Sequence, residues 1–349
     1  MKPRTVPSQC KFRGEKTYTT PRGEVNQIEE KFSYSRVSCY LSCPYKHYLR
    51  YVERVKKAAK SRPLYFGTDF HKLLELRGDK KALKAQLKQI EEQFYELPPS
   101  QQSELGDNYP QDIRQIFSDY RKMWKGTPIP DRTEKEFEIP ILTYKGTDVI
   151  FHGVIDGMYY NYPGTDNFVI EEHKTFNKKP DASAMVMNTQ KCLYAKAAFF
   201  LTGSFPDEVM WDYIKSTPAQ QPVWLEKSGR FSTASNQNIT PYSWKRACDE
   251  RGIEDEEIRS LGAKYESNLS NFFFRSFQDF IPEMVEDVFE GFKYTCRDVL
   301  RQGSKNKTKN ITFNCSFCDY FDLCYSQMTG GNVNYLFDSG YFVKGDEEE

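Results

Sequence analysis

Apolar side chains recur at helical spacing in several parts of this 349-residue chain. One stripe advances in alternating steps of four and three, which predicts an amphipathic helix that ends at Pro98. This stripe consists of Leu83, Leu87, Ile90, Phe94 and Leu97. The same spacing predicts further helices over residues 34–51 (with a second helix beginning at Pro44), 113–124, 188–200 and 282–301.

The pattern changes to strand-like alternation from Glu136 to Tyr160, around a turn at residues 145–147. Short apolar runs at 168–170 and 208–214 predict two more strands. Residues 216–242, rich in Ser, Gln, Asn and Thr, are expected to form a long loop or hairpin, and such segments are often functional. The order of elements predicts a mixed α/β core with added helices.

We expect one elaborated domain rather than several. The polar N-terminal segment carries three prolines and little periodicity, which indicates a loosely ordered arm. The expected division is an arm over 1–30, a single domain over 31–330 and a tail over 331–349. Within the domain we expect added helices over about 72–130, an α/β core over about 134–215 and C-terminal helices over about 240–330.

Charge and hydropathy limit the classes of partner. Lys plus Arg and Asp plus Glu both total 49, so any site for a polyanion must come from locally segregated charge. The N-terminus lacks the apolar region of a secretory signal, and no segment approaches the roughly 18 apolar residues of a membrane span. We therefore expect a soluble, cytoplasmic protein without a membrane partner.

Two carboxylates and a lysine follow a short apolar strand. Asp156 lies in one predicted strand, and Glu172 and Lys174 lie in the next, on the same face because side chains alternate along a strand. Oxygen ligands of this kind suit Mg²⁺ or Mn²⁺, and the lysine could orient or help deprotonate a water and stabilise charge on a phosphate. An isolated match of this kind is more often a surface ion pair, but the buried flank at 168–170 favours a functional site.

Two further elements carry residues of the same chemistry. Residues 67–75 (GTDFHKLLE) are expected to form a helix that presents His71, and Gln190 and Tyr194 lie four residues apart on one face of another helix. Taken singly, His71 is more often a structural histidine, and the Gln190–Tyr194 pair is more often packing.

Together and in this order, these elements resemble the RecB-like nucleases of the PD-(D/E)xK group. The resemblance implies a restriction-endonuclease-like mixed sheet with flanking helices, and it implies a Mg²⁺- or Mn²⁺-dependent deoxyribonuclease. Glu172 stands where many relatives have aspartate. The implied metal ligands are His71, Asp156, Glu172 and His173. The implied catalytic set is Asp156, Glu172 and Lys174, with Gln190 and Tyr194 binding DNA and supporting the lysine.

Four of the nine cysteines form a set with the spacing of a metal site. Cys43 precedes Pro44 near the N-terminus, and Cys315, Cys318 and Cys324 follow near the C-terminus. Four thiolates can hold a 4Fe-4S cluster or a Zn²⁺ ion, and the solitary, remote first ligand favours iron–sulfur. The set resembles the iron–sulfur branch of these nucleases, which includes the CRISPR spacer-acquisition nuclease and stand-alone phage exonucleases. If Cys43 is not the N-terminal ligand of this set, the nearby Cys39 is the alternative.

Two basic segments flank these cysteines. One runs from Lys46 to Arg62 between Tyr45, Tyr48 and Tyr51, and the other holds Lys305, Lys307 and Lys309. A cluster would bring both segments together as a track for phosphates, and the tyrosines could stack on unpaired bases or belong to the core.

We therefore expect a stand-alone, phage-type exonuclease acting on DNA ends or single strands in recombination, repair or phage DNA processing, with a possible protein partner. Two alternatives remain. One is a non-cutting DNA-binding subunit of a repair or integration complex, and the other is a protein-interaction module whose fold is held together by a structural zinc site.

Overall fold

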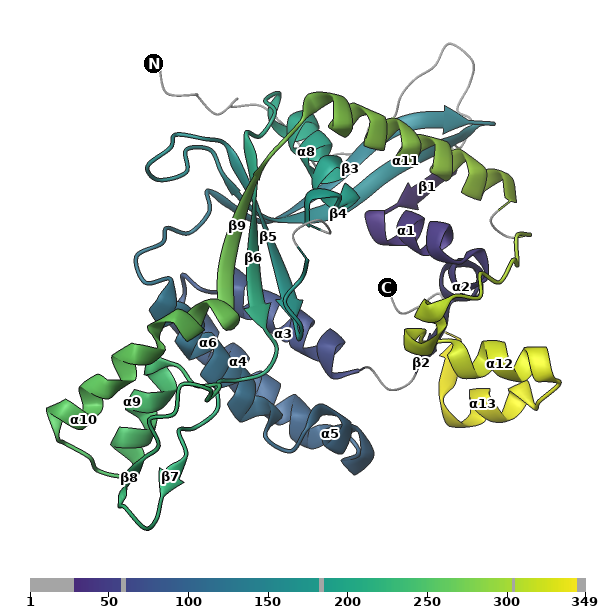
Figure 1. Cartoon of the computed structure of the whole chain (residues 1–349). Coiled ribbons are helices and arrows are strands. Elements are labelled where there is room, and N and C mark those ends of the chain that lie inside the picture. The colour runs from purple at the N-terminus through teal and green to yellow at the C-terminus, as the bar shows by residue number, and fades with distance from the viewer. Residues whose placement is uncertain (1–27, 58–60, 182–184, 303–304, 344–349) are drawn as a thin grey trace.

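The computed structural model describes residues 28–57, 61–181, 185–302 and 305–343. A six-stranded mixed sheet forms its centre (Figure 1). The strands lie in the order β1 (Ile28–Phe32), β4 (Thr147–Tyr159), β5 (Val169–Phe176), β6 (Glu208–Lys215) and β9 (Phe273–Asp279), and β3 (Arg132–Tyr144) also pairs with β4. The pairs β1–β4 and β5–β6 are parallel, whereas β3–β4, β4–β5 and β6–β9 are antiparallel.

Strand β4 changes partner along its length. It pairs with β1 up to Phe151 and with β5 from Gly157 onward. Asp156 therefore lies directly before the point where the pairing with β5 begins.

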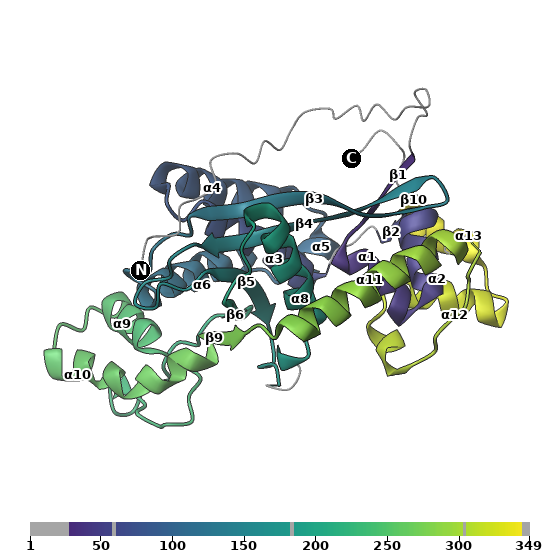
Figure 2. The same cartoon turned by 90° about the horizontal axis from the view of Figure 1, so that it is seen from above.

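Helices pack on both sides of the sheet. The first core joins the sheet to α1 (Tyr34–Ser42), α8 (Thr189–Thr202) and α11 (Pro282–Gln302). The second core joins β6 to α3 (Arg62–Glu75), α4 (Lys80–Glu96), α5 (Pro99–Leu105) and α6 (Tyr109–Met123). Figure 2 shows α11 running from the end of β9 toward α1 and α2. The sheet is thus the middle layer of three.

Two smaller units extend from this centre (Figure 1). The first unit is built around Trp244. It contains a hairpin of β7 (Trp224–Leu225) and β8 (Arg230–Phe231), the helices α9 (Pro241–Glu250) and α10 (Glu256–Ser260), and a 3-10 helix (Leu261–Asn271). The segment predicted over 216–242 as a loop or hairpin is therefore largely irregular, contains a short hairpin of two two-residue strands, and ends in the first residues of α9.

The other unit joins the two ends of the described chain. Strand β2 (Val55–Lys57) pairs antiparallel with β10 (Tyr341–Val343). Around them pack α2 (Pro44–His47), a π-helix (Tyr48–Val52), α12 (Phe321–Thr329) and α13 (Val333–Ser339), and a 3-10 helix (Phe313–Phe317) contacts α12. The C-terminal segment is thus held against an N-terminal one.

The predicted fold class is confirmed, as are the helices at α4, α6, α8 and α11 and the strands β3 to β6. The arm expected over 1–30 is corrected at its end, because residues 28–30 belong to β1; residues 1–27 lie outside the described chain. The expected tail over 331–349 contains α13 and β10. Strand β9 was not predicted, because its inward Arg275 breaks the apolar alternation that marks a strand.

No helix among the described residues is long and apolar enough to cross a membrane.

Candidate active site

Strand β5 supplies the carboxylate and the lysine of the site. Its alternation turns Glu172 and Lys174 to one face, where Lys174 Nζ lies 3.1 Å from Glu172 Oε2. Asp156 reaches the same strand from β4, because its Oδ2 accepts a hydrogen bond of 2.7 Å from the backbone N–H of His173. The predicted neighbourhood of these three side chains is therefore present.

Helix α8 places Gln190 and Tyr194 beside this pair. Lys174 Nζ donates to Gln190 Oε1 at 3.1 Å, and Gln190 Nε2 donates to Glu172 Oε2 at 3.3 Å. Tyr194, one turn further along α8, packs edge-on against Phe137 at 5.8 Å between ring centroids. Burial and the charge of Glu172 raise the pKa of Tyr194, so its hydroxyl stays protonated. Gln190 thus holds both the lysine and its carboxylate.

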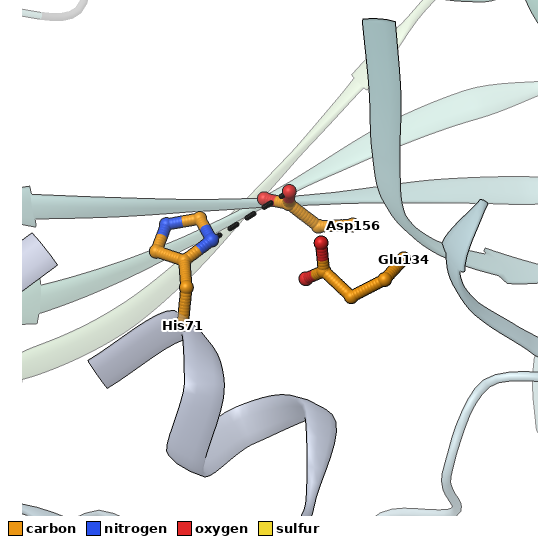
Figure 3. A group of neighbouring side chains, drawn as sticks. All are labelled: His71, Glu134 and Asp156. Carbon is orange, nitrogen blue, oxygen red and sulfur yellow. Dashed lines mark ion pairs between the residues drawn. The ribbon is translucent and has the colours of Figure 1, made fainter. Parts of the chain in front are cut away.

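Two further side chains, those of His71 and Glu134, lie beside Asp156 (Figure 3). His71 on α3 places Nδ1 3.6 Å from Asp156 Oδ1. Glu134 on β3 lies across from Asp156, because its neighbours Thr133 and Lys135 pair with Gly157 and Ile155. Ligand atoms of His71, Glu134 and Asp156 all lie within 4.8 Å of one another. This group could hold a divalent cation.

The sequence alone does not identify Glu134 as a metal-ligand candidate. Its backbone has φ +44°, a left-handed conformation that non-glycine residues rarely adopt and that is found more often at functional sites. In the sequence it is one of several charged residues in an alternating strand, and no pattern separates it from Glu136 or Glu138. Only the pairing of β3 with β4 reveals its place opposite Asp156.

The electrostatics of these side chains suit a cation. Burial and the nearby Asp156 carboxylate raise the pKa of Glu172 to about 8, although Lys174 opposes the shift. Burial, Asp156 and Glu75 raise the pKa of Glu134 to about 7. In addition, Glu172 Oε1 is buried and has no hydrogen-bond partner. Crowded carboxylates with an unpartnered oxygen fit Mg²⁺ or Mn²⁺, which take oxygen ligands.

His173 does not join this group. Its ring lies on the opposite side of β5, with Nδ1 3.4 Å from Asp212 Oδ2 and Nε2 3.7 Å from Glu171 Oε2. The alternation along β5 causes this, because His173 lies between Glu172 and Lys174. The structure therefore places the side chain of His173 on the side of β5 opposite Glu172 and Lys174, where its ring packs against that of His71, and its backbone contacts Asp156.

The four predicted cysteines come together in the unit that joins the chain ends. Cys43 caps α2, Cys315 lies in the 3-10 helix, Cys318 follows that helix, and Cys324 lies in α12. Burial raises the pKa of Cys324, and the neighbouring sulfurs of Cys43, Cys318 and Cys315 raise it further. Cys39 lies nearby in α1 but is buried. The set is assembled from both ends of the chain.

We expect Mn²⁺ affinity to rise as pH increases from about 6 to about 9. Glu134 and Glu172, with pKa values of about 7 and about 8, carry protons below this range, and a cation must displace them. Each proton released steepens the rise by up to about tenfold per pH unit. Electron paramagnetic resonance of free Mn²⁺ at constant ionic strength measures it. Glu134→Gln should flatten the profile, and an affinity independent of pH in the wild type would contradict this assignment.

Comparison with known proteins agrees with this geometry. A family model described as the PD-(D/E)XK nuclease superfamily matches residues 31–325. The chain belongs to the PD-(D/E)XK nuclease superfamily and is, as a member, a phosphodiester hydrolase of a class that uses divalent metals, typically Mg²⁺ or Mn²⁺. No curated protein matches the chain.

Solved structures give weaker similarity. The structure titled "Crystal structure of SSO0001" has a TM-score of 0.27 and 10% identity, and the match covers 75% of this chain and 94% of that one. Rai1 of Scheffersomyces stipitis, in complex with (3'-NADP)+ and calcium ion, has a TM-score of 0.16 and 13% identity, covering 77% and 82%. These scores are too low to support an inference about function.

Proposed function

We propose that this nuclease is an exonuclease that hydrolyses DNA from free ends or in single strands, in recombination, repair or phage DNA processing. The proposal rests on one observation: the group of His71, Glu134 and Asp156 lies beside the ion pair of buried Glu172 and partly exposed Lys174. Carboxylates and an imidazole can hold a divalent cation, and an ammonium beside them can stabilise the negative charge that develops on a phosphate during hydrolysis.

Each side chain has a role in this proposal. His71, Glu134 and Asp156, with Glu172, would hold Mg²⁺ or Mn²⁺. Bound there, the cation supplies a Lewis acid for the phosphate and lowers the pKa of a water. Burial lowers the pKa of Lys174, but Glu172 and Asp156 outweigh burial and raise it. Lys174 therefore stays charged and stabilises negative charge on the phosphate rather than accepting a proton.

We also propose that Cys43, Cys315, Cys318 and Cys324 hold a 4Fe-4S cluster. Two of the sulfurs accept backbone hydrogen bonds, as thiolate ligands do: Thr312 N lies 3.4 Å from Cys315 Sγ, and a hydrogen bond from the Tyr320 backbone reaches Cys318. A backbone hydrogen bond of 3.0 Å from Tyr45 N–H to the carbonyl of Thr308 joins the N-terminal and C-terminal segments beside these cysteines. Zn²⁺ on the same thiols is the alternative.

The basic segments on either side of the cysteines support a DNA substrate. Lys307 Nζ lies 4.2 Å from the centre of the Tyr48 ring, and Lys309 Nζ lies 4.8 Å from that of Tyr45, so the two segments meet as expected. Tyr45 itself is only 7% exposed and belongs to the core, which removes it as a stacking residue.

Other aromatic rings are better placed to meet unpaired bases. Phe313 and Phe317 are 81% and 76% exposed, and their rings lie 5.6 Å apart in the segment that follows the lysines. Exposed rings beside cations suit a single strand, because bases stack on the rings while lysines meet the phosphates.

Cleavage of end-labelled DNA tests the proposed function. Purified protein with Mn²⁺ is expected to shorten linear single-stranded DNA or duplex DNA from its ends, and chelation should stop the reaction. Circular single-stranded DNA of equal length is the matched control, and an exonuclease leaves it intact. Cutting of the circle would show an endonuclease. Binding of DNA without any product in either substrate would favour the non-cutting subunit.

A further inference from the structure

A buried polar cluster lies behind β5, on the opposite side from Lys174. Its centre is Asp212 of β6, which is fully buried and pairs in register with His173 of β5. Asp212 Oδ2 accepts a hydrogen bond from the hydroxyl of Tyr120 on α6 and lies 3.4 Å from Arg275 Nη2. The same oxygen lies 3.4 Å from Nδ1 of His173, a polar contact that lacks hydrogen-bond geometry. Three elements thus converge on one carboxylate.

This cluster is already neutralised by its own arginines. Arg77 Nη2 lies 2.8 Å from Glu171 Oε2, and Arg275 faces Asp212. Glu171, His173 and Asp212 have ligand atoms within 4.8 Å of one another, as a metal site would. Two guanidinium groups against two carboxylates leave no net negative charge to attract a cation. The geometry therefore favours an organising role over a second metal site.

His173 connects this cluster to the proposed metal ligands. Its backbone N–H donates to Asp156 Oδ2 at 2.7 Å, and its backbone also hydrogen-bonds the ring of His71. The two imidazole rings meet edge to face, with centroids 5.7 Å apart and planes at 87°. A change in the position of His173 would therefore displace both Asp156 and His71.

We propose that Asp212 is a positioning residue for the metal site. By holding the imidazole of His173, it fixes the piece of β5 backbone that orients Asp156 and the ring against which His71 packs. It touches neither substrate nor metal. The inference rests on the proposed function, because it assumes that Asp156 and His71 bind a divalent cation. Ligands held in place before binding lose less entropy when the cation arrives.

Mn²⁺ affinity of Asp212→Asn, measured on the full chain by electron paramagnetic resonance, tests this role. Loss of a partner behind metal ligands typically weakens binding by about 10-fold or more, and we expect that here. The matched control is Asp119→Asn. Asp119 is also buried and receives two bonds from Arg246, at 2.9 and 3.0 Å, but that pair links α6 to α9 away from the site. Both variants should melt earlier, whereas only Asp212→Asn should lose Mn²⁺ affinity.

Tyr120→Phe provides a second variant in case Asp212→Asn does not fold. It removes one hydrogen bond to Asp212 and keeps the ring, so a smaller loss of Mn²⁺ affinity, roughly 3-fold, is expected. If Asp212→Asn binds Mn²⁺ as tightly as the wild type does, the positioning role is overturned. If only Tyr120→Phe folds, wild-type Mn²⁺ affinity in that variant overturns it. Equal losses in Asp212→Asn and Asp119→Asn overturn it as well. Wild-type protein whose Mn²⁺ binding does not depend on Asp156 would instead contradict the proposed function.

Discussion

Asp156→Ala is expected to reduce DNA cleavage by at least about 1,000-fold while leaving DNA binding within a few-fold of wild type. Asp156 lies between the two halves of the site: it shares one group with His71 and Glu134, and its charge raises the pKa of Glu172. Its loss would remove a proposed ligand that no neighbour replaces. The proposed phosphate contacts of the basic segments do not involve Asp156 and should persist. Single-turnover cleavage and equilibrium binding of the same labelled DNA measure the two effects separately.

Lys174→Ala should show the same separation, because its ammonium is proposed to act on the reacting phosphate and not on the strand as a whole. Asp148→Ala is the matched control: Asp148 is also on β4, but its carboxylate accepts a hydrogen bond from the hydroxyl of Thr143 at the far end of the strand. Its cleavage rate should remain near wild type. Wild-type cutting by Asp156→Ala, or equal losses in all three variants, would show that the site is assigned incorrectly.

Cys43→Ser and Cys324→Ser are each expected to release iron, lose visible absorbance, melt earlier and lose nuclease activity. Both residues belong to the unit that joins the two ends of the described chain, and neither belongs to the sheet that carries Asp156: Cys43 directly precedes α2, and Cys324 lies in α12. The damage should be global, because the cluster would join segments from both ends of the chain. A loss of about 2 kcal/mol would lower the melting temperature by roughly 3 °C in a chain of 349 residues. Iron and sulfide assays with thermal melts measure both effects.

Two other cysteines serve as controls for this result. Cys192 and Cys248 are buried and pack in separate hydrophobic clusters, so their serine variants should keep colour and most activity. If Cys39→Ser bleaches the protein while Cys43→Ser does not, Cys39 is the first ligand. Wild-type protein that contains zinc and no sulfide would contradict the iron–sulfur proposal and favour the structural zinc site.

Periodicity in the sequence alone determined the main elements that build the site. The helices α4, α6, α8 and α11 and the strands β3 to β6 follow from spacing of apolar residues, because burial of one face imposes a period on the sequence. The alternation along β5 also placed Glu172 and Lys174 on one face, and a helical turn placed Gln190 near Tyr194. These relations are local, so a few neighbouring residues are sufficient to predict them.

Only the tertiary structure decided which distant residues meet at Asp156. Glu134 enters through the pairing of β3 with β4 and a positive φ, neither of which leaves a signal in the sequence. Asp212 is an acidic residue within the apolar run of β6, and its partners come from α6, β5 and β9. His173 adjoins predicted metal ligands in sequence, which suggests that it binds metal with them. The alternation along β5 instead turns its ring to the face of the sheet opposite Glu172 and Lys174. Contacts between elements depend on register and packing, which sequence periodicity does not specify.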